Sequence, residues 1–188
     1  MIRCFGCKNK DNRGMSLVEI IIVIAIMSVF IGVSGYGLSL SNNKAAAECA
    51  QKLCSALQHT RTVTMGKHET SLTLYMDAEG RIRVREVAQK LIDDNGNVEP
   101  EERQSIVGEN GVFVSCTLTD GSSVDISETN NITFSFNRGS GALEATYVNA
   151  VKCDENRNCR QITISKAGRT QYIVIVPVTG KIMITNTP

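Results

Sequence analysis

The chain has 188 residues, of which 42% are hydrophobic and 21% charged, and its formal net charge is +1. This length suits one domain of ordinary size plus an extra element, and the composition excludes an intrinsically disordered chain. The near-neutral charge argues against a protein that binds nucleic acid through an overall basic field.

The N-terminal region joins a basic leader to a long uncharged run. Residues 1–14 carry one acidic residue and four basic ones: Arg3, Lys8, Lys10 and Arg13. No charged residue occurs from Ile20 to Leu40, which is long enough for a helix to span a bilayer core. The positive-inside rule keeps the basic end in the cytoplasm. We therefore predict a single-pass cell-membrane protein whose C-terminal bulk is extracytoplasmic.

One carboxylate, Glu19, lies at the start of the apolar run, where an unpaired charge is costly. A plain signal anchor, a signal peptide cleaved near residues 33–35, and a carboxylate tolerated near the headgroups are three interpretations, and none gives Glu19 a role. In a fourth, the chain is cut between Gly14 and Met15, and the new α-amine lies one helical turn from Glu19. The carboxylate would then pair with the amine of a neighbouring subunit and set the packing register of the helices.

The string Arg13-Gly14-Met15-Ser16-Leu17-Val18-Glu19, followed by an isoleucine-rich run, resembles the class III signal of type IV pilins and pseudopilins. The resemblance implies cleavage between Gly14 and Met15 by a prepilin peptidase, N-methylation of Met15, and use of Glu19 in filament assembly. It also implies other pilin or pseudopilin subunits, an inner-membrane assembly platform with its ATPase, and membrane lipid as partners. Met15 departs from the phenylalanine that the family most often has there.

A helix is predicted from Met15 to Met65, with Gly66 as its stop. No proline interrupts it, and at about 1.5 Å per residue it would be roughly 75 Å long. Beyond Asn43, apolar or small residues recur at spacings of three and four and form one stripe: Ala46, Cys49, Leu53, Leu57 and Thr60. The first part would lie in lipid or a filament core, and the second would pack on a globular head.

Strand signals follow, with apolar and polar residues in alternation. The first hairpin is predicted over 71–76 and 81–85, and further strands near 112–118, 132–136, 142–148, 161–165, 171–178 and 181–185. Residues 88–111 are predicted as a polar loop, with a short helix at 87–92. The fold class is therefore α+β, pilin-like, with a long N-terminal helix packed on an antiparallel β-sheet head. The predicted organisation is a leader peptide at 1–14, a transmembrane and assembly helix at 15–40, and the head at 41–188.

Three later segments, 132–139, 161–165 and 172–184, resemble the C-terminal half of H-type minor pseudopilins of type II secretion, and Gln58-His59-Thr60-Arg61 resembles the same group. In that group the protein is a low-abundance subunit near the filament tip that helps to initiate assembly. Secretion, DNA uptake and adhesion all stay open as the role of the filament. A competence pilus subunit that contacts DNA, and a signal-anchored or secreted β-rich binding domain, are the alternatives.

Two of the seven cysteines, Cys4 and Cys7, lie in the leader and are at most half of a zinc site. The other five lie where disulfides can persist: Cys49, Cys54, Cys116, Cys153 and Cys159. Cys153 and Cys159 bracket a short polar loop, so we predict a disulfide between them that stabilises by about 2 kcal/mol. Cys49 is predicted in the core, and Cys54 could reach Cys116, so the full pairing stays open.

No metal, cofactor or catalytic group is predicted. The acidic segment Asp93–Glu102 lacks the glycine position of a calcium loop, and His59 and His68 have no nucleophile at a recognisable spacing. We therefore predict that the chain is not an enzyme.

Arg81, Arg83 and Arg85 lie on one face of a predicted strand. Such a stripe could contact phosphates in a DNA-uptake pilus. Because acidic residues flank it and no aromatic residues alternate with it, we predict a solvent-facing strand instead.

Overall fold

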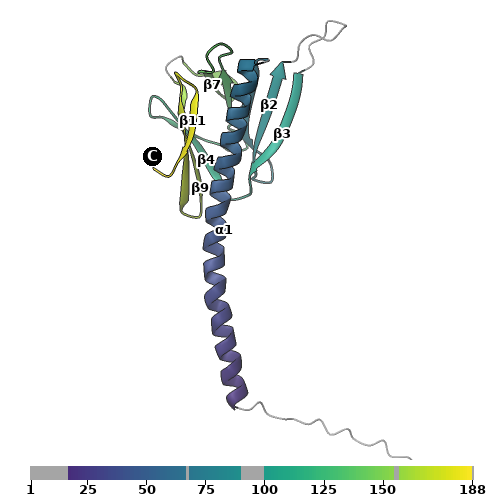
Figure 1. The fold of residues 1–188 in the computed structure, drawn as a ribbon, viewed down its shortest axis with the longest axis vertical. Helices are drawn as coiled ribbons and strands as arrows, with labels where there is room; N and C mark the ends of the chain where they lie inside the picture. Colours follow the sequence, from purple (N-terminus) through teal and green to yellow (C-terminus); the bar gives the residue numbers. More distant parts are fainter. Residues whose placement is uncertain (1–16, 67, 90–99, 155–156, 188) are drawn as a thin grey trace, which may run out of the picture. The chain divides into compact units, whose positions relative to one another are not determined.

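The computed structural model describes residues 17–66, 68–89, 100–154 and 157–187, and within residues 32–43 the backbone alone is described. In this part of the chain one long helix, α1 (Leu17–Gly66), precedes eleven strands (Figure 1). The strands are β1 (Thr70–Met76), β2 (Ile82–Gln89), β3 (Pro100–Gly108), β4 (Phe113–Leu118), β5 (Ser123–Asp125), β6 (Ile132–Phe136), β7 (Leu143–Val148), β8 (Val151–Lys152), β9 (Cys159–Lys166), β10 (Arg169–Val176) and β11 (Lys181–Thr185). The chain divides into two units, residues 1–40 and 41–188, and each is described by itself.

Two antiparallel sheets form the second unit. The six-stranded sheet has the order β3-β2-β1-β6-β7-β8, and the five-stranded sheet has the order β11-β10-β9-β4-β5. Alternation explains most of the faces: Leu72 and Leu74 of β1 are fully buried, and Ser71 and Tyr75 on either side of this pair are partly exposed. Thr73 between the two leucines is also buried, and its hydroxyl lies 2.9 Å from that of Thr133 on β6. The predicted α+β class with an antiparallel sheet is confirmed, and the arrangement is compatible with a pilin-like fold.

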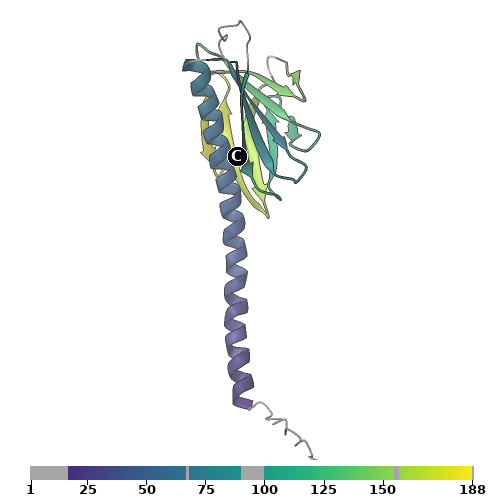
Figure 2. The ribbon, with the colours of Figure 1, turned by 90° about the vertical axis from the view of Figure 1, so that its right-hand side faces the viewer.

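The second part of α1 completes the core of the head, and it runs along the sheets in both views (Figures 1 and 2). Every member of the predicted stripe is fully buried: Ala46, Cys49, Leu53, Leu57 and Thr60. Leu53 and Leu57 belong to one hydrophobic cluster with residues of both sheets, such as Phe134 and Ile164. Burial raises the pKa of the Cys49 thiol to about 12, against a weaker opposing effect of nearby Lys52, so the thiol stays protonated as a core residue.

The prediction for residues 88–111 is wrong over the described part. β2 continues to Gln89, which leaves no helix at 87–89, and β3 occupies Pro100–Gly108; residues 90–99 lie outside the described residues. β3 is the last strand of its sheet, and its residues 100–106 are all exposed. An edge strand with two solvated faces lacks the alternation that identifies a strand. The short strands β5 and β8 are not predicted either, because two or three residues are too few to show an alternation of apolar and polar side chains.

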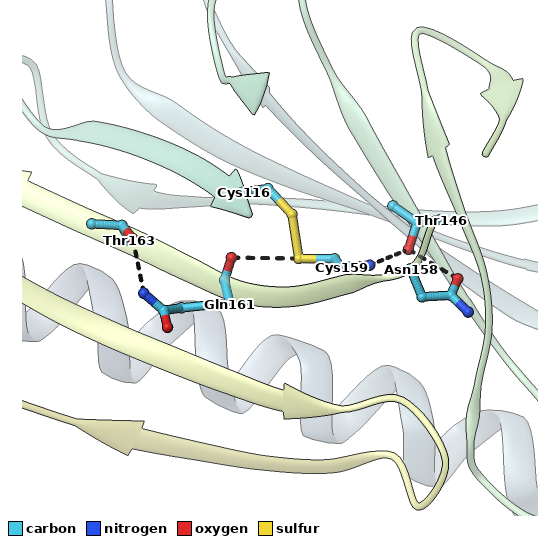
Figure 3. The surroundings of a disulfide bond; sticks show 6 residues. All are labelled: Cys116, Thr146, Asn158, Cys159, Gln161 and Thr163. Atoms are coloured by element: carbon cyan, nitrogen blue, oxygen red, sulfur yellow. Dashed lines mark hydrogen bonds between the residues drawn. A yellow bond between two sulfur atoms is a disulfide. The ribbon is translucent and has the colours of Figure 1, made fainter. Parts of the chain in front are cut away.

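The disulfide prediction is also wrong. Cys159 is joined to Cys116 with their Cα atoms 6.3 Å apart (Figure 3). Cys153 is a free thiol. Cys116 on β4 and Cys159 on β9 face the core from neighbouring strands, because β4 pairs with β9. The backbone amide of Cys153 instead donates to the Thr146 carbonyl at 2.9 Å and is held against β7. Cys54, proposed as a partner of Cys116, is free and buried.

Thr146 helps to fix the disulfide-bonded end of β9. Its side-chain oxygen Oγ1 accepts a hydrogen bond of 3.0 Å from the Cys159 amide, and the same hydroxyl lies 3.4 Å from Asn158 Oδ1 (Figure 3). The side chain is fully buried, so these bonds satisfy a group that would be costly to leave unpaired. β7 thus supports the Cys116–Cys159 crosslink, although it belongs to the other sheet.

The pairing of cysteines predicts opposite outcomes for two serine variants. Cys116→Ser should open a crosslink between residues 43 positions apart and lower the free energy of unfolding by about 4 kcal/mol on the chain-entropy model. Cys153→Ser should keep the disulfide and change stability by less than about 1 kcal/mol. Non-reducing peptide mapping and urea denaturation measure both effects. A Cys153–Cys159 disulfide in the unaltered protein, lost in Cys153→Ser and kept in Cys116→Ser, would contradict the structure.

Candidate functional site

The first part of α1 presents apolar side chains on all sides. Twelve large apolar residues between Leu17 and Ile31 have exposed fractions between 44% and 73%: Leu17, Val18, Ile20, Ile21, Ile22, Val23, Ile24, Ile26, Met27, Val29, Phe30 and Ile31. A helix that is apolar all round is typical of a segment buried by other molecules or by lipid, and a contiguous exposed apolar surface marks an interaction site. This segment is the candidate functional site.

Polar groups within this segment are few, and their positions matter. Glu19 is exposed and lies in the first turn of α1, where the helix dipole favours a negative charge. Ser28 donates its hydroxyl to the Ala25 carbonyl at 2.8 Å, which satisfies its donor without water. Glu19 is therefore the one side chain of residues 17–31 that needs a charged partner from elsewhere once the segment is buried.

The predicted cleavage and methylation residues, Gly14 and Met15, lie outside the described residues, as do Cys4 and Cys7. Among the residues that the structure does describe, we find no helix that is both sufficiently long and sufficiently apolar to cross a membrane.

The string Gln58-His59-Thr60-Arg61 attaches α1 to both sheets. Gln58 Nε2 donates to the carbonyl of Ile182 on β11 at 3.4 Å. On the other side, His59 Nδ1 lies 3.2 Å from Glu86 Oε2 on β2, and Thr60 Oγ1 donates to Glu86 Oε1 at 3.3 Å. These residues resemble a family pattern in the sequence, and their role in the structure is to hold the helix against the head. No sequence pattern identifies Glu86 as the partner of His59 and Thr60.

Arg61 extends this attachment to two turns that are far away in the sequence. Its Nε donates to the Gly141 carbonyl at 2.9 Å, and an Nη atom donates to the Thr179 carbonyl at 3.2 Å. Gly141 and Gly180 adopt positive φ angles of 66° and 64°, which favour glycine. A Cβ at Gly180 would overlap the Gly141 carbonyl, and one at Gly141 would overlap Met65 and approach Arg61. Because 80 or more residues separate Arg61 from these turns, no local sequence pattern predicts the contact.

The arginine stripe is largely engaged by neighbouring side chains. Asp77 Oδ2 accepts hydrogen bonds from Arg81 Nε at 3.0 Å and from Arg83 Nε at 2.6 Å, and Arg85 lies over the ring of Tyr75. Desolvation raises the pKa of Asp77, but bonds from the Arg81 amide and from both guanidiniums outweigh it and hold the pKa below its usual value. Two of the three cations are thus paired within the chain, which disfavours a phosphate-binding role.

The two histidines share one cavity. His59 and His68 line a space of about 320 Å³ together with Glu86 and Glu101. Within the described part of the chain, no group of three or more histidine, cysteine or acidic residues is placed to hold a metal ion. Of the predicted acidic segment, residues 93–99 lie outside the description and 100–102 belong to β3.

Comparison with known proteins identifies the N-terminal segment. The model of the prokaryotic N-terminal methylation motif matches residues 9–35, which include Gly14, Met15 and Glu19. The match supports a type IV pilin-like family, whose members are generally structural and are processed by a prepilin peptidase. No curated protein and no solved structure matches the chain.

The turn that contains Gly141 contacts the turn that contains Gly180. This contact predicts unequal effects of two glycine-to-alanine variants. Gly168 has a positive φ of 80° but nothing within 4 Å of an added Cβ, so Gly168→Ala should cost about 1 kcal/mol of backbone strain alone. Gly180→Ala adds overlap with the Gly141 carbonyl and should cost at least about 3 kcal/mol. Chemical denaturation measures the free energies of unfolding. Equal losses would show that the two turns do not pack as described.

Proposed function

We propose that this chain is a minor pseudopilin, a structural subunit of a type IV pilus-like or type II secretion filament. The observation that carries the proposal is the joining of a methylation motif at residues 9–35 to a helix that is apolar all round with one carboxylate in its first turn. Assembly, and not catalysis, is the activity that such a helix supports. The head then serves as the part of the subunit that is displayed outside the membrane.

In this proposal the precursor inserts with residues 1–14 in the cytoplasm and the head outside the membrane. Prepilin peptidase cuts between Gly14 and Met15 and methylates the new α-amine. Before cleavage no amine exists at residue 15, so Glu19 has no cationic partner in the packed helices. Leaving a carboxylate unpaired in an apolar environment costs several kcal/mol, and this cost prevents premature assembly.

After cleavage, the Met15 amine of one subunit pairs with Glu19 of its neighbour, and an assembly platform driven by an ATPase moves the subunit from lipid into the filament. An H-type role, at low abundance near the tip, is supported by the resemblance of the strands at 132–139, 161–165 and 172–184. Pairing of Arg81 and Arg83 with Asp77 makes a secretion filament a better match than a DNA-binding one.

The proposal predicts the N-terminus of the mature protein. Top-down mass spectrometry of the membrane fraction should find a chain that begins at N-methylated Met15, because the peptidase removes the leader after Gly14. In cells without the peptidase, the intact precursor should accumulate. A mature chain that begins at Tyr36, or an intact Met1 in the presence of the peptidase, would instead support a secreted or signal-anchored binding domain.

A second prediction separates processing from assembly. Glu19→Ala should be cleaved and methylated normally but should fail to enter filaments, since it no longer pairs with the neighbouring amine. Sheared filaments and membranes are compared by quantitative immunoblot, with Ser28→Ala as the control within the same helix. Incorporation of Glu19→Ala at the level of that control would refute the role assigned to the carboxylate.

A further inference from the structure

β3 is a long unpaired sheet edge. It ends the six-stranded sheet and has nine residues, of which the first seven are exposed. The other edge strands in the described part of the head are shorter: β8 has two residues, β5 has three and β11 has five. The outer backbone donors and acceptors of an edge strand are free to pair with another chain.

A groove runs along this edge. Its volume is about 640 Å³, and it lies between one flank of α1 and β3, with Glu86 of the neighbouring strand β2 also in its lining. Lys52, Ser55 and His59 line it from the helix, and Arg103, Ser105 and Ile106 line it from the strand. A strand added to β3 would therefore have the helix flank on one face and solvent on the other, with successive side chains alternating between them.

The charges of the groove select the kind of segment that fits. Lys52 and Arg103 are exposed, and neither forms an ion pair within the described residues. The acidic side chain that lines the groove is Glu86, which is 13% exposed and already binds His59 and Thr60. The exposed acids Glu101 and Glu102 lie at the start of β3, outside the lining of the groove, so the basic part of the edge begins at Arg103. Two unpaired cations next to an engaged carboxylate attract negative charge.

We propose that β3 accepts an extended, acidic segment of a partner protein as an additional antiparallel or parallel strand, with its acidic side chains directed at Lys52 and Arg103. Main-chain hydrogen bonds to β3 supply the affinity, and the two cations supply the selectivity, as in other cases of strand addition. The proposal concerns residues 41–188 and does not depend on cleavage at residue 14 or on filament assembly.

The test uses the full-length protein in detergent micelles and a fluorescein-labelled peptide of four Val-Glu repeats. Fluorescence anisotropy should show saturable binding at 0.15 M salt, whereas a peptide of four Val-Lys repeats should not bind. A peptide of four Pro-Glu repeats carries the same charge but lacks half of the backbone donors, and its proline rings disfavour pairing within a sheet, so it should bind at least about tenfold more weakly. Hydrogen–deuterium exchange should show slower exchange in residues 100–108 on binding and no change in residues 181–185.

Charge reversal supplies the matched variants. Lys52→Glu with Arg103→Glu should weaken binding of the Val-Glu peptide at least about tenfold, because both cations of the groove are reversed. Arg160→Glu with Arg169→Glu changes the net charge equally at two exposed positions of β9 and β10, and should weaken binding by less than about threefold at this salt concentration.

Three results would overturn the proposal. The first is no binding of the Val-Glu peptide at millimolar concentration. The second is binding without slower exchange in residues 100–108. The third is equal binding of the Val-Glu and Pro-Glu peptides, which would indicate charge attraction without strand addition. If β3 becomes protected in the peptide-free protein as its concentration rises, the edge pairs with a second copy of the chain and the proposed partner is wrong.

Discussion

The structure depends on one constraint, which is that a single helix has to satisfy two environments. In its second part, α1 is apolar along one stripe, and the two sheets cover that stripe in the same chain. In its first part, the twelve exposed apolar side chains between Leu17 and Ile31 have no such cover. Removing them from water is worth on the order of ten kcal/mol or more, which exceeds the cost of burying one carboxylate. Apolar burial therefore favours any surroundings that remove this segment from water, whether lipid or neighbouring helices, and Glu19 decides which packing of helices is tolerated.

Attachment of the second part of the helix to the sheets is the second requirement, because this part of α1 completes the core of the head. Apolar packing at Leu53 and Leu57 supplies most of the contact area, but it is non-directional. Hydrogen bonds from Arg61 to the Gly141 and Thr179 carbonyls, and from Thr60 to Glu86, fix the rotation and register of the helix. A few directional contacts thus turn an adaptable interface into a defined one.

The parts of the structure that could be predicted are those determined by local periodicity. The helical stripe from Ala46 to Thr60 and the central strands bury one face and expose the other, so the alternation of residue types reveals them. β3 could not be predicted, because most of its side chains are exposed and its sequence therefore lacks the alternation of apolar and polar residues. The Cys116–Cys159 disulfide depends on the pairing of β4 with β9, and no local pattern specifies which strands become neighbours. For the same reason, no local pattern reveals Glu86 as the partner of His59 and Thr60, or Gly141 and Thr179 as the acceptors of Arg61.

Charged residues on β3 have two consequences that are compatible. Charges on an edge strand oppose indiscriminate pairing with other sheets. Arg103 and the acidic pair Glu101 and Glu102 thus explain how a nine-residue edge can stay open, whereas the other described edge strands of the head are shorter. Arg103, together with Lys52 of the groove, attracts an acidic strand, whereas Glu101 and Glu102 repel acidic side chains at the start of β3. Specificity arises from such repulsion as well as from attraction. An edge that is long, open and charged is therefore consistent with selective recognition, whereas protection alone would be served equally well by a short strand such as β5 or β8.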